Sequence, residues 1–185
     1  MSEKNTDKAV RKISRFVVLP TEIPVDADRK FSSSEAGNLR KGALYIDSVL
    51  ADELKTVQGA QILNAVQMDG FSTKVTGNRL DMIRDIGQKL HCEAVLMTVL
   101  NRYHQREGGD YAADNPASAS FLLQLVRVED GQVIWQGNFD ETQETLLSNL
   151  FSFGKARDRG FKWVSVEELV RQGVHERLAS CPYIN

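Results

Sequence analysis

The sequence predicts an α/β (α+β) fold with a single mixed sheet, an antiparallel C-terminal meander and flanking helices. Residues 94–103, AVLMTVLNRY, are apolar on both alternating sides for most of their length, which is typical of a central strand covered above and below. Residues 118–143 contain two further long strands joined by an Asp-Gly turn. Apolar residues at three- and four-residue spacing in other segments predict the helices.

The N-terminal part of the chain predicts a strand, a helix and a second, short strand. Residues 13–19 form the first strand, ended by Pro20, and its continuous apolar run indicates burial on both faces of the sheet. The helix spans residues 34–54, Gly59 ends the helical segment, and residues 60–63 offer a short strand near a sheet edge. The apolar stripe of the helix consists of Leu39, Ala43, Ile46, Leu50 and Leu54, broadened by Leu44 and Val49.

The next part of the chain predicts a second helix and leaves one segment open. Residues 65–77 fit either a loop or a short helix, because glycines interrupt them. The helical pattern is clear over residues 78–90, where Gly87 falls on the inner face and predicts close packing against the sheet. The N-cap of this helix is either Asn78 or Thr76.

The turn between the two C-terminal strands is Glu129-Asp130-Gly131-Gln132. Asp-Gly favours a two-residue hairpin loop, in which both central positions need positive φ. After the turn, Val133, Trp135 and Phe139 fall on alternate positions. This alternation places Trp135 against the core as a packing residue.

The C-terminal part of the chain predicts two helices separated by a loop. Residues 145–153 predict a helix that is apolar on more than one side, and residues 154–162 a solvated loop with several basic residues. Ser165 and Glu168 stand three positions apart and form a capping box at the start of the last helix. The buried stripe of this helix consists of Leu169, Val170, Val174 and Leu178.

Composition places the chain among globular proteins. It has 185 residues, of which 42% are hydrophobic and 26% charged, and a net charge of −2. Charges of both signs are mixed along the chain, which argues against nucleic-acid binding. No stretch approaches the length of an apolar membrane helix, and the first residues lack the apolar middle of a signal peptide. We expect residues 1–12 to be a flexible N-terminal tether and residues 13–185 a single α/β domain.

The strong catalytic motifs are absent from the sequence, which has no Gly-rich phosphate loop, paired CxxC, HExxH or GxSxG. His91, Cys92 and Glu93 are the best local candidates for metal ligands, but three adjacent residues of an extended chain cannot converge on one ion. His104 and His175 are isolated in the sequence, and we interpret them as surface residues. We therefore expect no enzymatic activity, no metal and no cofactor.

The two cysteines, Cys92 and Cys181, permit one intramolecular disulfide. Such a bridge would close a loop of about 90 residues and stabilise the fold by up to about 4–5 kcal/mol. Cys92, however, begins a strand with a buried pattern, and buried free cysteine is common. The sequence therefore leaves open whether the two cysteines are bridged or free.

The predicted elements follow in the order strand, helix, short strand, helix, three-strand meander and terminal helices. This order resembles that of bacterial envelope lipoproteins of the CsgG-like and LpoB-like group, whose domain is similar to the N-terminal domain of TolB. Three segments also resemble this group: LHCEAVLMTVLNRYHQREGG, SASFLLQLVRVEDGQVIWQGNFDETQ and FKWVSVEELVRQGV. The resemblance covers residues 16–178. It implies a non-enzymatic protein held at the periplasmic face of the outer membrane by a lipidated N-terminal cysteine.

The resemblance also implies a partner in the cell envelope. Some members of the group bind and activate peptidoglycan synthases, and one builds a secretion channel. We therefore expect a module that binds or scaffolds an envelope protein, possessing a lipid anchor in its full precursor. We expect Met1 to stand where the lipid-acceptor cysteine of that precursor lies.

Two regions are expected to meet the partner. One is residues 107–115, a long connection between strands, and the other is residues 161–163, before the last helix. Aromatic residues are enriched among the residues that dominate interfaces. The alternative is a cytosolic ligand-binding or enzymatic α/β domain with its site at the C-terminal ends of the parallel strands. The predicted partner-binding residues are Tyr111, Trp163, Phe161 and Asp110.

Overall fold

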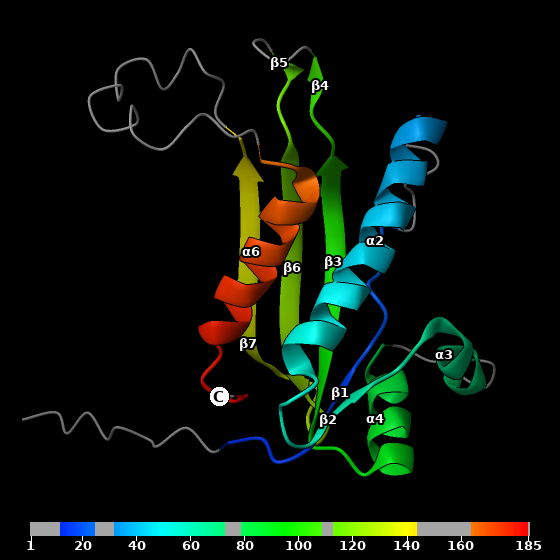
Figure 1. The fold of residues 1–185 in the computed structure, drawn as a ribbon. Coiled ribbons are helices and arrows are strands. Elements are labelled where there is room, and N and C mark those ends of the chain that lie inside the picture. Colours follow the sequence, from blue (N-terminus) through cyan, green and yellow to red (C-terminus); the bar gives the residue numbers. More distant parts are fainter. Residues whose placement is uncertain (1–11, 25–31, 73–78, 109–112, 144–163, 185) are drawn as a thin grey trace, which may run out of the picture.

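The structure, a computed structural model, describes residues 12–24, 32–72, 79–108, 113–143 and 164–184. Its main sheet consists of β1 (Phe16–Val18), β2 (Ala60–Ile62), β3 (Ala94–His104), β6 (Ser118–Arg127) and β7 (Val133–Thr142). The strand order is β2-β1-β3-β6-β7 (Figure 1). Strand β1 runs parallel to β2 and β3, whereas β6 runs antiparallel to β3 and β7. The prediction of a mixed sheet with an antiparallel C-terminal meander is confirmed.

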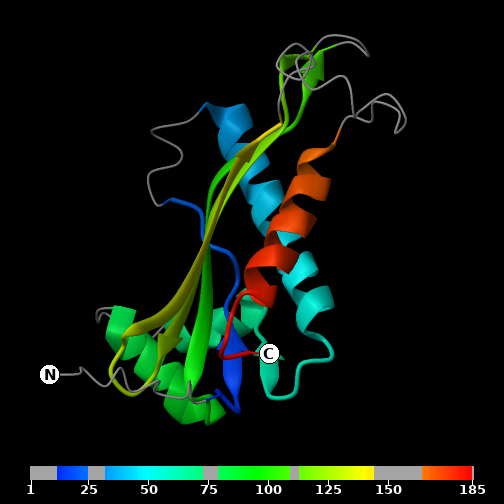
Figure 2. The ribbon, with the colours of Figure 1, turned by 90° about the vertical axis from the view of Figure 1, so that its left-hand side faces the viewer.

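Helices cover the two faces of this sheet to different extents (Figure 2). The helices α2 (Ser33–Leu54) and α6 (Val166–Ala179) pack along one face. On the other face, α4 (Arg79–Leu90), with α3 (Ala65–Ser72) packed beside it, covers the half of the sheet where β3 begins. Within the described ranges, no helix combines the length and the apolar character that crossing a membrane requires.

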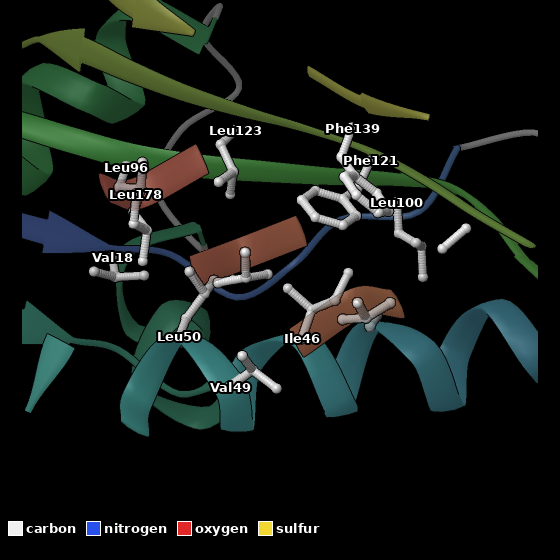
Figure 3. Packing of buried hydrophobic residues seen from close by; sticks show 14 of the residues in the cluster. Val18, Ile46, Val49, Leu50, Leu96, Leu100, Phe121, Leu123, Phe139 and Leu178 are labelled. Atoms are coloured by element: carbon white, nitrogen blue, oxygen red, sulfur yellow. The ribbon is translucent and has the colours of Figure 1, made fainter. Parts of the chain in front are cut away.

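The sheet separates two hydrophobic cores, because successive strand residues point to opposite faces. Val18 and Leu96 join the core under α2 and α6, whereas Val17 and Val95 join the core under α4. Figure 3 shows the first of these cores, where side chains of α2 and α6 meet the sheet. The predicted burial of β1 and β3 on both faces is confirmed.

Within the described residues, no helix packs against the outer face of the sheet beside the second half of β3; α4 covers that face only near the start of β3. The β3–β6 register shifts between Leu100 and Arg102, which makes a β-bulge there. After the bulge, Tyr103 turns inward onto α2, while its neighbours on either side face outward. In the ladder, Arg102 lies opposite Ser120 and His104 opposite Ser118. This stretch of the outer face is therefore polar.

The turn between β6 and β7 differs from the predicted two-residue loop. The ladder closes with the Gln132 carbonyl accepting from the Arg127 N–H at 2.9 Å, so residues 128–132 form the connection. Only Gly131 has positive φ, at 73°. Asp130 instead accepts a hydrogen bond from the Gln132 N–H at 3.0 Å and one from Arg127 at 2.9 Å. These local bonds hold Asp130 out of the left-handed conformation that the predicted turn required.

The helices follow the predicted patterns with one exception. The capping box of Ser165 and Glu168 at the start of α6 is confirmed, and so is the close approach at Gly87, where a Cβ would lie 2.2 Å from a Val128 methyl. Leu44 was expected to broaden the α2 stripe, but its side chain is 71% exposed. It follows a buried alanine by one residue, which rotates its side chain by about 100° around the helix, away from the sheet. The helix predicted over residues 145–153 lies outside the described residues.

The two cysteines are both free and buried. Cys92 belongs to the core under α4, whereas Cys181 belongs to the core under α2 and α6. The sheet therefore lies between the two thiols, which leaves no route to a bridge without unfolding. Burial raises the pKa of both thiols. The structure decides the open question in favour of free cysteines.

Candidate functional site

A two-stranded arm extends from the end of β3 and the start of β6 (Figure 1). It consists of β4 (Glu107–Gly108) and β5 (Ala113–Asn115), which pair antiparallel. The amide of Asn115 donates a hydrogen bond to the Glu107 carboxylate at 3.1 Å. The connection predicted to be a loop over residues 107–115 is thus a strand pair along its flanks.

Hydrogen bonds from Tyr103 and Gln105 fix the base of this arm to the first turn of α6. The Tyr103 hydroxyl donates to Glu167 Oε1 at 3.2 Å, and the Gln105 side-chain amide donates to Glu167 Oε2 at 3.0 Å. The Gln105 Oε1 atom accepts the Val166 N–H at 3.2 Å. The base of the arm therefore moves with α6 and with the body of the sheet.

The electrostatics of this contact favour a neutral phenol beside a carboxylate. Burial raises the pKa of Tyr103, and the negative charge of Glu167 raises it further. Burial also opposes ionisation of Glu167, but hydrogen bonds from its own N–H and from Gln105, Tyr103 and Ser165 outweigh it and lower the pKa of the carboxyl. At neutral pH the phenol donates and the carboxylate accepts, which is a charge-assisted hydrogen bond.

Val164, the described residue that follows the second predicted partner-binding region, lies close to the same place. The Gln143 N–H donates to the Ala117 carbonyl at 2.8 Å, at the foot of the arm. With its amide oriented to satisfy both atoms, the Gln143 side chain donates to the Val164 carbonyl at 3.1 Å and accepts the Val164 N–H at 2.9 Å. Residues 143 and 164, which flank the segment 144–163, therefore meet beside the arm. The predicted residues Tyr111, Asp110, Phe161 and Trp163 themselves lie outside the described residues.

A cleft of about 340 Å³ opens on the other side of β3, between the first turns of α2, the end of β3 and the start of β6. Its apolar wall includes Leu39 and Tyr103. It lies at the C-terminal end of β3, the position that the alternative interpretation predicted for a ligand site. Its polar lining consists of Glu35, Asn101, Arg102, His104, Ser118 and Ser120.

Arg102 forms one fixed side of the cleft. Its Nε donates to the Ser118 hydroxyl at 3.2 Å, and its terminal nitrogen donates to the Asp140 carboxylate and to the Glu141 carbonyl. These partners lie on β6 and β7, so the guanidinium spans three strands. Asp140 compensates the charge of the arginine.

Glu35 forms the opposite side, where the capping box of α2 holds it. The Ser32 hydroxyl and backbone N–H donate to Glu35 Oε2 at 2.6 and 2.9 Å. These hydrogen bonds lower the pKa of Glu35, and the imidazole of His104 across the cleft lowers it slightly more. His104, interpreted from the sequence as an isolated surface residue, lines the cleft from the end of β3.

The other candidates from the sequence do not form a site. His91 adopts a φ of 51°, and the Glu93 carboxylate accepts the Ser14 N–H at 3.3 Å. His175 lies 2.9 Å from Glu53 at the exposed side of α6. Across the residues that the structure describes, no three His, Cys, Asp or Glu side chains are grouped to hold a metal ion.

Comparison with known proteins supports the fold. Neither a family model nor a curated protein sequence matches the chain. The structure is similar to the PelC dodecamer from Paraburkholderia phytofirmans, with a TM-score of 0.53, 11% identity and coverage of 95% of this chain and 91% of that one. It is also similar to the hypothetical protein CT253 from Chlamydia trachomatis, with a TM-score of 0.52, 15% identity and coverage of 92% and 98%. Escherichia coli LpoB aligns at a TM-score of 0.42 with 16% identity, over 70% of this chain and 57% of that one, which is too low to carry an argument.

Proposed function

We propose that this protein is a non-enzymatic module of the bacterial cell envelope, held at the outer membrane by its N-terminal end, that binds or scaffolds an envelope protein. The proposal follows from the sequence resemblance to envelope lipoproteins. The observation that carries it is a separation in space: the N-terminal segment and the arm are at opposite ends of β3.

The two ends are defined by hydrogen-bonded neighbours. Phe16 pairs with Ala94, the first residue of β3, and Ile13 donates its N–H to the Tyr183 carbonyl at 3.2 Å at the same end. The arm continues from His104, the last residue of β3. At the usual rise per residue, the 11 residues of β3 separate these ends by about 35 Å. A chain tethered at its N-terminus would carry the arm away from the membrane surface.

The arm end has the properties of a platform for a partner. Its base is fixed to α6 through Glu167 and Val166, and Gln143 and Val164 meet beside it. The described residues that adjoin the two predicted partner-binding regions therefore lie at one end of the molecule. A binding surface on a fixed base loses less conformational entropy on association than one on a free loop. A peptidoglycan synthase is the first partner to test.

Site-specific photo-crosslinking in cells tests the partner-binding end. A photoreactive residue placed at Tyr111 or Trp163 should crosslink to an envelope protein. Val66 is a matched control, because its side chain is 79% exposed on α3, a helix that packs on α4 and not on the arm. The same products from all three positions, or none from Tyr111 and Trp163, would contradict the proposed binding end.

The gene sequence upstream of Met1 tests the membrane anchor. A lipoprotein signal ending in a lipid-acceptor cysteine supports the anchored module, with residues 1–12 as its tether. A native start at Met1, with no such signal, would remove the anchor and favour the alternative of a cytosolic ligand-binding or enzymatic domain.

A further inference from the structure

The cleft beside β3 contains polar groups that have no partner within the described residues. The Ser120 side chain is only 8% exposed, lines the cleft, and makes no hydrogen bond to another described residue. The amide of Asn101, at the β-bulge, is likewise without a described partner and lies at the cleft wall. Both groups lie at the surface of the cleft, where a ligand can hydrogen-bond them.

The charged groups of the cleft, by contrast, already have partners. Arg102 is paired with Asp140, and Glu35 accepts two hydrogen bonds from Ser32. A ligand therefore needs no net charge of its own to enter. The groups that remain available are an amide, hydroxyls, an imidazole and the second carboxylate oxygen of Glu35, a set that offers both donors and acceptors.

The apolar part of the wall completes the pattern. Leu39 is buried, and one face of Tyr103 packs against Gly42, so both side chains are fixed in place. The wall thus combines a rigid apolar surface with neutral hydrogen-bonding groups. Sugar rings present the same combination, since their hydroxyls both donate and accept while their C–H faces are apolar. The cleft volume of about 340 Å³ lies at the lower end of the range for small-molecule sites.

We propose that this cleft binds an uncharged saccharide of one or two rings, with Asn101 and Ser120 hydrogen-bonding its hydroxyls. The inference concerns a site separate from the partner-binding arm tip, and it does not depend on the lipid anchor. Glu35 contacts the ligand from α2 and His104 from the end of β3, and Leu39 supplies the apolar surface.

An NMR titration of the full chain tests the proposal. The probes are N,N′-diacetylchitobiose, maltose and inorganic phosphate, each followed by backbone amide shifts. Diacetylchitobiose or maltose should give saturable shifts centred on Asn101, His104 and Ser120. Diacetylchitobiose acting alone would indicate an acetylated amino sugar, maltose acting alone a neutral glucan, and equal responses to both a site that recognises the sugar ring without its acetamido group.

Two variants and a control make the assignment specific. Asn101→Leu and Ser120→Ala should each weaken saccharide binding by up to about tenfold, the effect of one lost hydrogen bond. Asn138→Leu is the control, because it is exposed on β7 and outside the cleft lining, and it should leave binding within about twofold.

Three outcomes would overturn the saccharide site. They are the absence of saturable shifts with either sugar, shifts of equal size with phosphate, and unchanged binding by both cleft variants. None of these outcomes affects the proposal that the arm end binds a partner, because crosslinking at Tyr111 and Trp163 probes a different surface.

Discussion

The Tyr103 hydroxyl donates a hydrogen bond to the Glu167 carboxylate at 3.2 Å, which joins the central strand β3 to the first turn of α6 across 64 residues of sequence. The ring of the same tyrosine packs over Gly42 of α2. One side chain therefore ties together the two helices of one layer and the strand that leads into the arm.

Replacing this hydroxyl tests how much the contact stabilises the fold. Tyr103→Phe should lower the free energy of unfolding by about 0.5–1.5 kcal/mol, because a half-buried charge-assisted hydrogen bond is lost while the ring stays in place. Chemical denaturation measures the difference. Tyr45→Phe is a matched control, since its hydroxyl accepts an exposed bond from Arg171 and should matter less. A larger loss in the control would contradict the assignment.

Two glycines of α2 should respond in opposite directions to the same change. A Cβ at Gly42 would lie 2.5 Å from the Tyr103 ring, so Gly42→Ala should destabilise the protein by about 1–3 kcal/mol through overpacking. Gly37 has no atom within 4 Å of that position, so Gly37→Ala should stabilise the protein by about 0.4–1 kcal/mol. Thermal unfolding of both variants checks the pair. Stabilisation of both variants would show that helix propensity outweighs the contact with Tyr103.

Asp47 should make stability depend on pH in the acidic range. Burial raises the pKa of this carboxyl above its ordinary value, although the carboxylate accepts the Thr21 N–H at 2.8 Å. The folded protein therefore binds the proton more tightly than the unfolded chain, and this group makes stability fall as the pH rises from the unfolded pKa through the folded pKa. Asp47→Asn removes that loss and keeps an oxygen acceptor.

The expected result for Asp47→Asn is a gain at neutral pH, below about 1 kcal/mol because the group is partly exposed to solvent, that vanishes in acid. Denaturant titrations at pH 3 and pH 7 measure it. Asp52→Asn, on the exposed side of the same helix, controls for the change in net charge. A gain that is equal at both pH values would exclude titration of Asp47 as its cause.

The thiols should be free but protected. Denatured, unreduced protein should show two reactive thiols, and the native protein should react slowly at both, because Cys92 and Cys181 are buried and their raised pKa disfavours the thiolate. A colorimetric thiol assay with and without denaturant makes the measurement. Fewer than two thiols after denaturation would contradict the free state.

Elements set by local pattern could be predicted from the sequence. The strand over residues 94–103 and the capping box of Ser165 and Glu168 depend on residues close together in the chain, and both are confirmed. The prediction of a two-residue turn at Asp130 was wrong. The Asp130 side chain accepts the Gln132 N–H, and this local bond favours a backbone conformation other than the one that the Asp-Gly preference predicts. The prediction that Leu44 is buried was wrong, because moving by one residue along a helix can turn a side chain from the core to the solvent.

The cleft could not be predicted in the same way. Its lining comes from α2, the end of β3 and the start of β6, which meet only after the strands pair. The bulge after Leu100 also shifts the alternation of β3, so a simple count along the strand assigns the following residues to the wrong face. One local signal was present: the three-residue spacing of Ser32 and Glu35 marks a capping box that fixes the carboxylate.

Force applied between the N-terminal segment and the arm would load the β1–β3 pair in shear. Strand β1 begins beside Ala94, and the arm continues from His104 at the far end of β3. Because the two strands run in the same direction, pulling on these points slides one along the other and stretches the hydrogen bonds between them together. Pulling the arm sideways instead loads its hydrogen bonds to Glu167 and Val166. A force along the strands is therefore carried by the β1–β3 ladder, and a force across them by side-chain contacts at the base of the arm.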